Sequence, residues 1–147
     1  MQEIHFSPGT DCLNAINRTL RNARHTAKIC VFTITDNRIV DAILEMQRNG
    51  VKVQIISDND KRDDLGSDIG YLVRQGIEIK LDTTSAHMHH KFAVIDNETT
   101  ITGSYNWTRS AETKNYENIL ITDNEYIAKT FLQEFDRLWD IMEPVYQ

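Results

Sequence analysis

The strongest constraint on the fold is a repeated switch between strand-like and helix-like apolar patterns in the first half of the chain. A β-rich run at residues 29–34 is followed by an amphipathic helix pattern at 39–46 and by an alternating strand pattern at 51–56. A further helix pattern at 67–74 and a strand pattern at 77–81 continue this order. Strands that alternate with helices form a sheet with helical crossovers, so we expect parallel pairing in this half.

The two ends of the chain complete the expected fold. A short strand ends at Phe6-Ser7-Pro8, and a helix capped by Thr10 or Asp11 follows it. In the second half we expect strands, separated by short polar turns, at 89–95, 99–102 and 117–122. A C-terminal helix carries one apolar stripe, formed by Ile127, Phe131, Phe135, Leu138 and Met142. The sequence thus predicts an α/β fold with a mixed, mostly parallel β-sheet flanked by helices on both faces, in a single domain that spans residues 1–147.

Composition and charge limit the functions that this domain can have. The chain has 147 residues, of which 40% are hydrophobic and 26% charged, as expected for one compact core. The net charge of −6 argues against a protein that covers nucleic acid with its whole surface. Any site for a polyanion is therefore expected to be local.

The cysteines and the N-terminal segment indicate in which cellular compartment the protein is expected. Cys12 and Cys30 both lie in apolar periodic segments, which is typical of buried reduced thiols, so we expect no disulfide. The segment 1–6 has no basic start and no long apolar stretch, and no apolar run approaches the length of a transmembrane segment. We expect a cytoplasmic protein by default, and a periplasmic or secreted one if a signal peptide has been removed.

The residues that carry chemistry are concentrated between positions 89 and 118. On a strand, His89 and Lys91 project to the same side, which places a nucleophile beside a cation. The strand at 99–102 ends at Gly103, which allows the backbone to turn and present Ser104 and Asn106 as hydrogen-bond donors. Such groups suit the oxygens of a phosphate.

This stretch reads H-x-K-x₄-D-x₆-G-S-x-N, with Asp96 as its D, and Glu117 follows in the next strand. The pattern resembles the signature of the phospholipase D superfamily. The opening Phe6-Ser7-Pro8 also resembles the start of the small single-motif bacterial nucleases of that superfamily. The resemblance extends over nearly the whole chain and implies a phospholipase D-like fold.

The resemblance implies a role for each motif residue. His89 would attack phosphorus and form a phosphohistidine, and no metal or other cofactor would be needed. Lys91, Ser104 and Asn106 would bind the phosphate oxygens and stabilise charge in the transition state. Glu117 would accept a hydrogen bond from the other ring nitrogen of His89 and fix its tautomer. Asp96, in contrast, is expected to be structural.

The number of motifs in the chain has a consequence for assembly. The reaction of the family uses two motif histidines, one as nucleophile and one as the acid that protonates the leaving oxygen. This chain carries one motif, so the resemblance implies a homodimer with the active site at the twofold interface.

Several other patterns have competing interpretations. A metal site at His87, His89 and His90 is disfavoured because neighbouring strand residues point to opposite faces. The loop 57–64 resembles a calcium loop only loosely and is better explained as a solvated charged loop. Two alternatives stay open for the groups beside the motif: base stacking or packing for Tyr105, Trp107 and Tyr116, and phosphate binding or plain solvation for Arg109 and Lys114.

The leading functional hypothesis is a metal-independent phosphodiesterase that acts as an endonuclease of low sequence specificity, because the short chain has no recognisable base-reading module. Nucleic acid would then be the substrate. The alternative is a phospholipase D or cardiolipin-type hydrolase with a phospholipid substrate, although no amphipathic anchor is evident. A binding module that has lost turnover is a third class, and the intact His89, Lys91, Asn106 and Glu117 argue against it.

Overall fold

The structure is a computed structural model that describes residues 1–58 and 68–146. Strands and helices alternate through the first half, as the apolar patterns predict. The elements in chain order are β1 (Gln2–Phe6), α1 (Asp11–Arg21), β2 (Thr26–Val31), α2 (Asn37–Arg48), β3 (Lys52–Asp58), α3 (Ile69–Arg74), β4 (Glu78–Asp82), β5 (Lys91–Ile95), β6 (Thr99–Gly103), α4 (Arg109–Thr113), β7 (Asn118–Thr122), α5 (Glu125–Ile141) and β8 (Glu143–Pro144). Ser67 and residues 59–64, which belong to the expected third helix and charged loop, lie outside the described residues.

All described strands belong to one mixed sheet with the order β1-β7-β6-β5-β2-β3-β4-β8. Only the β2–β3 and β3–β4 pairs are parallel, and the other pairs between described strands are antiparallel. The mixed sheet is confirmed, but the expectation of a mostly parallel one is wrong. The reason is that β2-α2-β3 and β3-α3-β4 join neighbouring strands by helical crossovers, whereas a short turn joins β5 to β6 and thereby requires antiparallel pairing.

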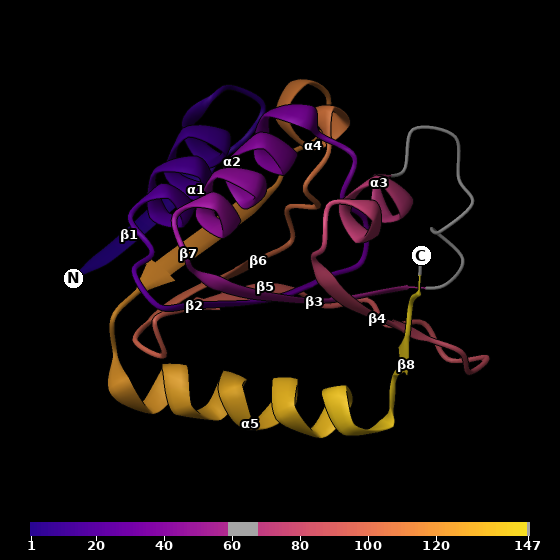
Figure 1. Cartoon of the computed structure of the whole chain (residues 1–147). Helices are drawn as coiled ribbons and strands as arrows, with labels where there is room; N and C mark the ends of the chain where they lie inside the picture. Colours follow the sequence, from indigo (N-terminus) through magenta and orange to yellow (C-terminus); the bar gives the residue numbers. More distant parts are fainter. Residues whose placement is uncertain (59–67, 147) are drawn as a thin grey trace.

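Helices cover both faces of the sheet, as expected. Figure 1 shows α1 and α2 side by side on one face and α5 across the other. Strand β5 contributes to both layers, because Ala93 and Ile95 pack in the α1/α2 core and Phe92 and Val94 pack in the α5 core. No helix of the described residues is long and apolar enough to cross a membrane.

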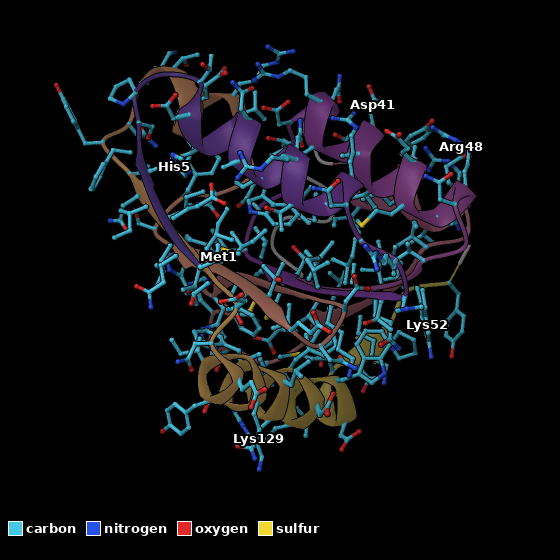
Figure 2. The ribbon with its side chains drawn as sticks, turned by 90° about the vertical axis from the view of Figure 1, so that its left-hand side faces the viewer. Met1, His5, Asp41, Arg48, Lys52 and Lys129 are labelled. Atoms are coloured by element: carbon cyan, nitrogen blue, oxygen red, sulfur yellow. The ribbon has the colours of Figure 1, made fainter. Side chains whose placement is uncertain are left out.

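The polar sides of the helices face solvent. Figure 2 shows Asp41 and Arg48 on the outer side of α2 and Lys129 on the outer side of α5. Two acidic residues of α5 do more than face solvent: Glu134 contacts His90 and Arg137, and Asp136 accepts a hydrogen bond from Lys28. Cys12 and Cys30 are both buried and free, in agreement with the sequence.

Asp96 has the structural role that the sequence predicts for it. It follows β5 at the opposite end from His89, and its carboxylate accepts hydrogen bonds from the backbone N–H groups of Arg24, His25 and Thr26 at 2.7–3.1 Å. Burial alone would raise the pKa of Asp96, but these donors outweigh it and the pKa lies below the ordinary value. The carboxylate therefore fixes the start of β2 against the end of β5.

We expect Asp96→Asn to lower the free energy of unfolding at pH 7 by about 1–3 kcal/mol, because it removes the charged acceptor of these bonds. A folded-state pKa below the unfolded value means that this stabilisation is present above about pH 4 and is lost as pH falls through the folded pKa. Urea unfolding at pH 7 and pH 3 measures both effects, with Asp140→Asn on the exposed face of α5 as the control. An equal difference between wild type and variant at the two pH values would contradict this role.

Candidate active site

The structure brings His89 and Lys91 together, although His89 is not on a strand. Strand β5 begins at Lys91, and His89 lies in the irregular segment before it. The Lys91 ammonium nitrogen lies 3.0 Å from His89 Nδ1 and donates to the His89 carbonyl oxygen at 2.8 Å. A hydrogen-bonded contact therefore makes the two residues neighbours, whereas the sequence attributed their proximity to strand alternation.

The surroundings of this pair favour a neutral imidazole. Burial and the nearby charges of Lys91 and His87 lower the pKa of His89 below its ordinary value of 6.5. An ammonium can only donate, so Nδ1 accepts, and the proton of the neutral ring then lies on Nε2. His89 is nevertheless exposed on its outer side, where a substrate can reach it.

Phe32 is a member of the site that the sequence reasoning missed. Its ring lies 4.5 Å from the His89 ring, centroid to centroid, and the Lys91 nitrogen lies 5.7 Å from the Phe32 centroid. This distance suits a cation–π interaction. Phe32 follows β2, whereas the motif begins with His89 beyond β4, so no local pattern connects them.

Ser104 connects the end of β6 to the start of β7 through hydrogen bonds. Its backbone N–H donates to the Asn118 carbonyl, and its hydroxyl oxygen accepts from the Asn118 N–H at 3.1 Å. The preceding Gly103 approaches β7 so closely that a Cβ there would lie 2.0 Å from the Asn118 carbonyl oxygen. Gly103 is thus required by the spacing of the strands, and the Ser104 hydroxyl keeps its proton for a further acceptor.

Asn106 lies between two side chains that are almost fully buried. Tyr105 and Trp107 are each 1% exposed, so both pack in the core and neither is available to stack on a base. Tyr116, in contrast, is 92% exposed beside Glu117. The Asn106 Oδ1 atom is buried and has no hydrogen-bond partner in the described part of the chain. Its carboxamide is therefore held mainly by the backbone.

That backbone is anchored to the loop before α2. Trp107 donates from its N–H to the Thr33 carbonyl at 3.1 Å, and its carbonyl accepts from the N–H groups of Thr35 and Asp36 at 3.0 Å. Trp107 therefore fixes the position of its neighbour Asn106 in the chain.

An ion network of two buried carboxylates and the half-buried Arg38, which the sequence did not indicate, reinforces this anchor. The Arg38 guanidinium binds the Asp36 carboxylate at 2.7–3.0 Å and the Glu112 carboxylate at 2.8–3.0 Å. Asp36 is fully buried and also caps α2 by accepting from the Arg38 N–H. Arg38 therefore connects the start of α2 to α4, the helix that begins shortly after Asn106 at Arg109.

Glu117 lies just before β7, where its carboxylate accepts a hydrogen bond from Asn115 at 3.2 Å. Burial lowers the pKa of Lys91, and the Glu117 charge acts in the opposite direction. The expected hydrogen bond from His89 to Glu117 is not among the contacts of the described residues, where Lys91 occupies Nδ1. The orientation of His89 by Glu117 stays a prediction.

The other histidines of the segment have separate partners. His90 Nε2 lies 3.0 Å from Glu134 on α5, and His87 Nδ1 lies 3.7 Å from the buried carboxylate of Asp58. Within residues 1–58 and 68–146, no three His, Cys, Asp or Glu side chains are grouped as metal ligands. Arg109 and Lys114 are both exposed.

A groove of about 400 Å³ opens beside His89, between the segment 82–90 and the C-terminal half of α5. Its polar lining includes His90, Glu134 and Arg137. Apolar side chains line much of the rest, namely Met88, Leu138, Ile141 and Met142. Polar and apolar side chains therefore both line the groove that lies beside His89.

Comparison with solved structures and known proteins is consistent with this geometry. Nuc from Salmonella typhimurium, described as a phospholipase D family member, superposes with a TM-score of 0.93 at 25% identity, and the alignment covers 100% of this chain and 99% of Nuc. NucT from Helicobacter pylori gives a TM-score of 0.90 at 26% identity, with 99% of each chain covered.

Curated relatives match at higher identity but are longer proteins. A mitochondrial cardiolipin hydrolase from Chlamydomonas reinhardtii is 44% identical over 97% of this chain, and one from Homo sapiens is 37% identical over 92%. The chain spans 64% and 54% of the lengths of these two relatives. Residues 16–139 match the family described as cardiolipin synthase, PLD-like domain. The chain therefore belongs to the PLD-like family of the phospholipase D superfamily.

Proposed function

We propose that this protein hydrolyses phosphodiesters through a phosphohistidine on His89, without a metal ion. The observation that carries the proposal is the exposed His89, which has a lowered pKa and holds the Lys91 ammonium 3.0 Å from its Nδ1. A neutral imidazole beside a fixed cation supplies both a nucleophile and a group that binds phosphate oxygens.

The reaction proceeds in two displacements. A ring nitrogen of His89 attacks phosphorus, the bond to the leaving oxygen breaks, and a second histidine donates a proton to that oxygen. Water then attacks the phosphohistidine, the same second histidine takes the proton from water, and His89 is released. Lys91, Ser104 and Asn106 bind the non-bridging oxygens in both steps.

The contact between Lys91 and Nδ1 defines a step that substrate binding has to perform. Attack through Nε2 requires the proton to move to Nδ1, where the ammonium now donates. A phosphate attracts the ammonium toward its own oxygens, and the Glu117 carboxylate then accepts a hydrogen bond from the Nδ1–H group. In the absence of substrate, the contact between Lys91 and Nδ1 thus keeps the ammonium beside the nucleophile.

Nucleic acid is the substrate that we propose first, with cleavage as an endonuclease of low sequence specificity. The exposed Tyr116 next to Glu117 offers a surface on which a base can stack. Arg109 and Lys114 are exposed close to Asn106 in the chain and supply positive charge for neighbouring phosphates. The low specificity rests on the sequence, which carries no recognisable base-reading module.

A phospholipid is the second candidate substrate, because two observations favour it. The groove that starts at His89 is lined by Met88, Leu138 and other apolar side chains, which suit the apolar part of a lipid. The curated relatives described above are named cardiolipin hydrolases. The same chemistry at His89 would act on either substrate.

The second histidine would come from another copy of the chain, so we propose a homodimer with a shared active site. The sheet offers a surface for this contact on the α5 side of β1 and β7. Ile4 and Phe6 of β1 are 61% and 66% exposed there, and Leu120 of β7 pairs with Ile4. The neighbouring Asn118 bonds to Ser104, so this face is continuous with the active site.

The composition of this face supports a second copy as its partner. We call the group Ile4, Phe6, Thr102, Asn118 and Leu120 the β1/β7 face. None of these residues is charged, although the chain has a net charge of −6. Two copies can therefore approach through it without repulsion between like charges, and a twofold contact places each face against the other.

The mechanism requires a neutral His89, and its titration can be measured directly. We expect the pKa of His89 to lie below 6.5 and to rise in Lys91→Met, because removal of the neighbouring cation makes protonation easier. NMR titration of the His89 ring signals measures both values, with Lys114→Met as the control. A His89 pKa above 6.5 in the wild type, or a fall in Lys91→Met, would rule out this electrostatic arrangement.

Activity should persist in EDTA and depend on the motif. We expect cleavage of single-stranded DNA, duplex DNA or RNA by the wild type in EDTA, no cleavage by His89→Asn, and a loss of about 100-fold or more in Lys91→Ala and Asn106→Ala. If the protein cleaved cardiolipin in vesicles but left all three nucleic acids intact, a phospholipid and not nucleic acid would be its substrate. Loss of all activity in EDTA that Mg²⁺ restores would refute the mechanism.

The β1/β7 face can be tested by one charged substitution. We expect Phe6→Glu to weaken self-association by about 100-fold or more, since it places two like charges in an apolar contact, and to lower activity in parallel. Sedimentation equilibrium measures the association, and Tyr71→Glu on the exposed side of α3 is the control. A dimer that survives Phe6→Glu would exclude this face, whereas a fully active monomer would exclude the shared site.

A further inference from the structure

Ser7 is a buried polar residue that the proposed mechanism does not use. It directly follows β1, is 5% exposed and makes three hydrogen bonds to the segment before β7. Its N–H donates to the Glu117 carbonyl at 3.0 Å, its hydroxyl oxygen accepts from the Glu117 N–H at 3.1 Å, and its hydroxyl donates to the Asn115 carbonyl at 2.8 Å. Both backbone hydrogen-bonding groups of Glu117 are thus bound by one residue.

The hydroxyl has a specific function in this contact. The ladder between β1 and β7 ends with Phe6 opposite Asn118, so Ser7 and Glu117 lie one position beyond it. There the Ser7 hydroxyl oxygen, and not a backbone carbonyl, accepts from the Glu117 N–H, while the same O–H group donates to the Asn115 carbonyl. Removal of the hydroxyl would leave the Glu117 N–H without this acceptor at a half-buried position.

The Asn115 contact adds to this restraint. The side-chain amide of Asn115 donates to the Glu117 carboxylate at 3.2 Å, and its backbone carbonyl is held by the Ser7 hydroxyl. Ser7 therefore fixes the backbone of Glu117 directly and its carboxylate through Asn115. Among the hydrogen bonds of the described residues, none joins Ser7 to His89, Lys91, Ser104 or Asn106.

We propose that Ser7 is a positioning residue that holds the Glu117 carboxylate at the active site. This inference rests on the proposed role of Glu117 in the reaction. A Ser7 that only ends the β1–β7 ladder would affect stability alone, whereas a positioning residue acts on catalysis through Glu117.

A double-mutant cycle separates these two roles. We expect Ser7→Ala to lower kcat about 10-fold with little change in KM, and Glu117→Gln to lower it further. Ser7→Ala added to Glu117→Gln should cost less than 2-fold more, because Glu117 no longer has a charge to position. Losses that multiply in the double variant would overturn the proposal. Thr19→Val, which removes a hydroxyl bonded to the Ala15 carbonyl on α1, is the control and should keep wild-type kcat.

A second measurement tests Ser7 without any substrate. The Glu117 charge acts to raise the pKa of Lys91, so displacement of the carboxylate should lower it. NMR titration of the Lys91 side chain should give a lower pKa in Ser7→Ala, in the same direction as in Glu117→Gln. An unchanged Lys91 titration would overturn the proposal even if the activity falls.

The two measurements keep this inference distinct from the proposed function. If the wild type cleaves no phosphodiester, the proposed function fails, and the Lys91 titration still decides the role of Ser7. Ser7→Cys, which keeps the size of the side chain and a weaker donor, is a second variant in case Ser7→Ala does not fold. It should lower the Lys91 pKa in the same direction by a smaller amount, and an unchanged pKa in both variants would overturn the proposal.

Discussion

The close approach of Gly103 to Asn118 sets the geometry on which the rest of the site depends. Any side chain at Gly103 would meet the Asn118 carbonyl, so this contact can form only with glycine. It allows the end of β6 and the start of β7 to lie together, with Ser104 bonded to Asn118. Because β5 pairs with β6, the same register places Lys91, at the start of β5, level with Gly103 and Ile119, two residues from Glu117. A glycine that the sequence explains by a tight turn thus acts here by permitting strand proximity.

The Arg38 network illustrates how buried charge can serve a polar site. Burial of the Asp36 and Glu112 carboxylates beside the half-buried Arg38 costs solvation free energy, and an apolar replacement of equal size is often no less stable. The network therefore needs a further explanation, and its position supplies one. Asp36 binds the Trp107 carbonyl through its backbone, and Glu112 lies on the helix that follows Asn106. Directional ion pairs fix this segment more precisely than apolar contacts, and the Asn106 Oδ1 atom has no hydrogen-bond partner among the described residues to hold it in place.

Features of the fold and site could be predicted from the sequence where the residues that form them lie close together in the chain. Local periodicity located the main helices and the strands of the β-α-β units, because their apolar faces repeat within a few residues. The motif predicted His89, Lys91, Ser104 and Asn106 as site residues, and the structure places them around the start of β5 and after the end of β6, which pairs with β5. The mostly parallel sheet was wrong, since pairing direction depends on how the chain returns to the sheet. Phe32, the Arg38 network and the bonds of Ser7 to Glu117 join residues far apart in sequence, so no local pattern indicates them.

In the proposed mechanism, the His89–Lys91 contact explains why the site needs elements from both ends of the chain. Lys91 can leave Nδ1 for a phosphate only if another acceptor takes over that ring nitrogen, since an imidazole with an unsatisfied Nδ1 proton would turn away from the attack direction. Glu117 can act as that acceptor only if its backbone does not move when the charges rearrange. The rigidity of Glu117 comes from Ser7, which β1 delivers to the edge of the sheet beside β7. The N-terminal strand is thus linked to the chemistry through the residue that follows it, although it contributes no side chain to the phosphate.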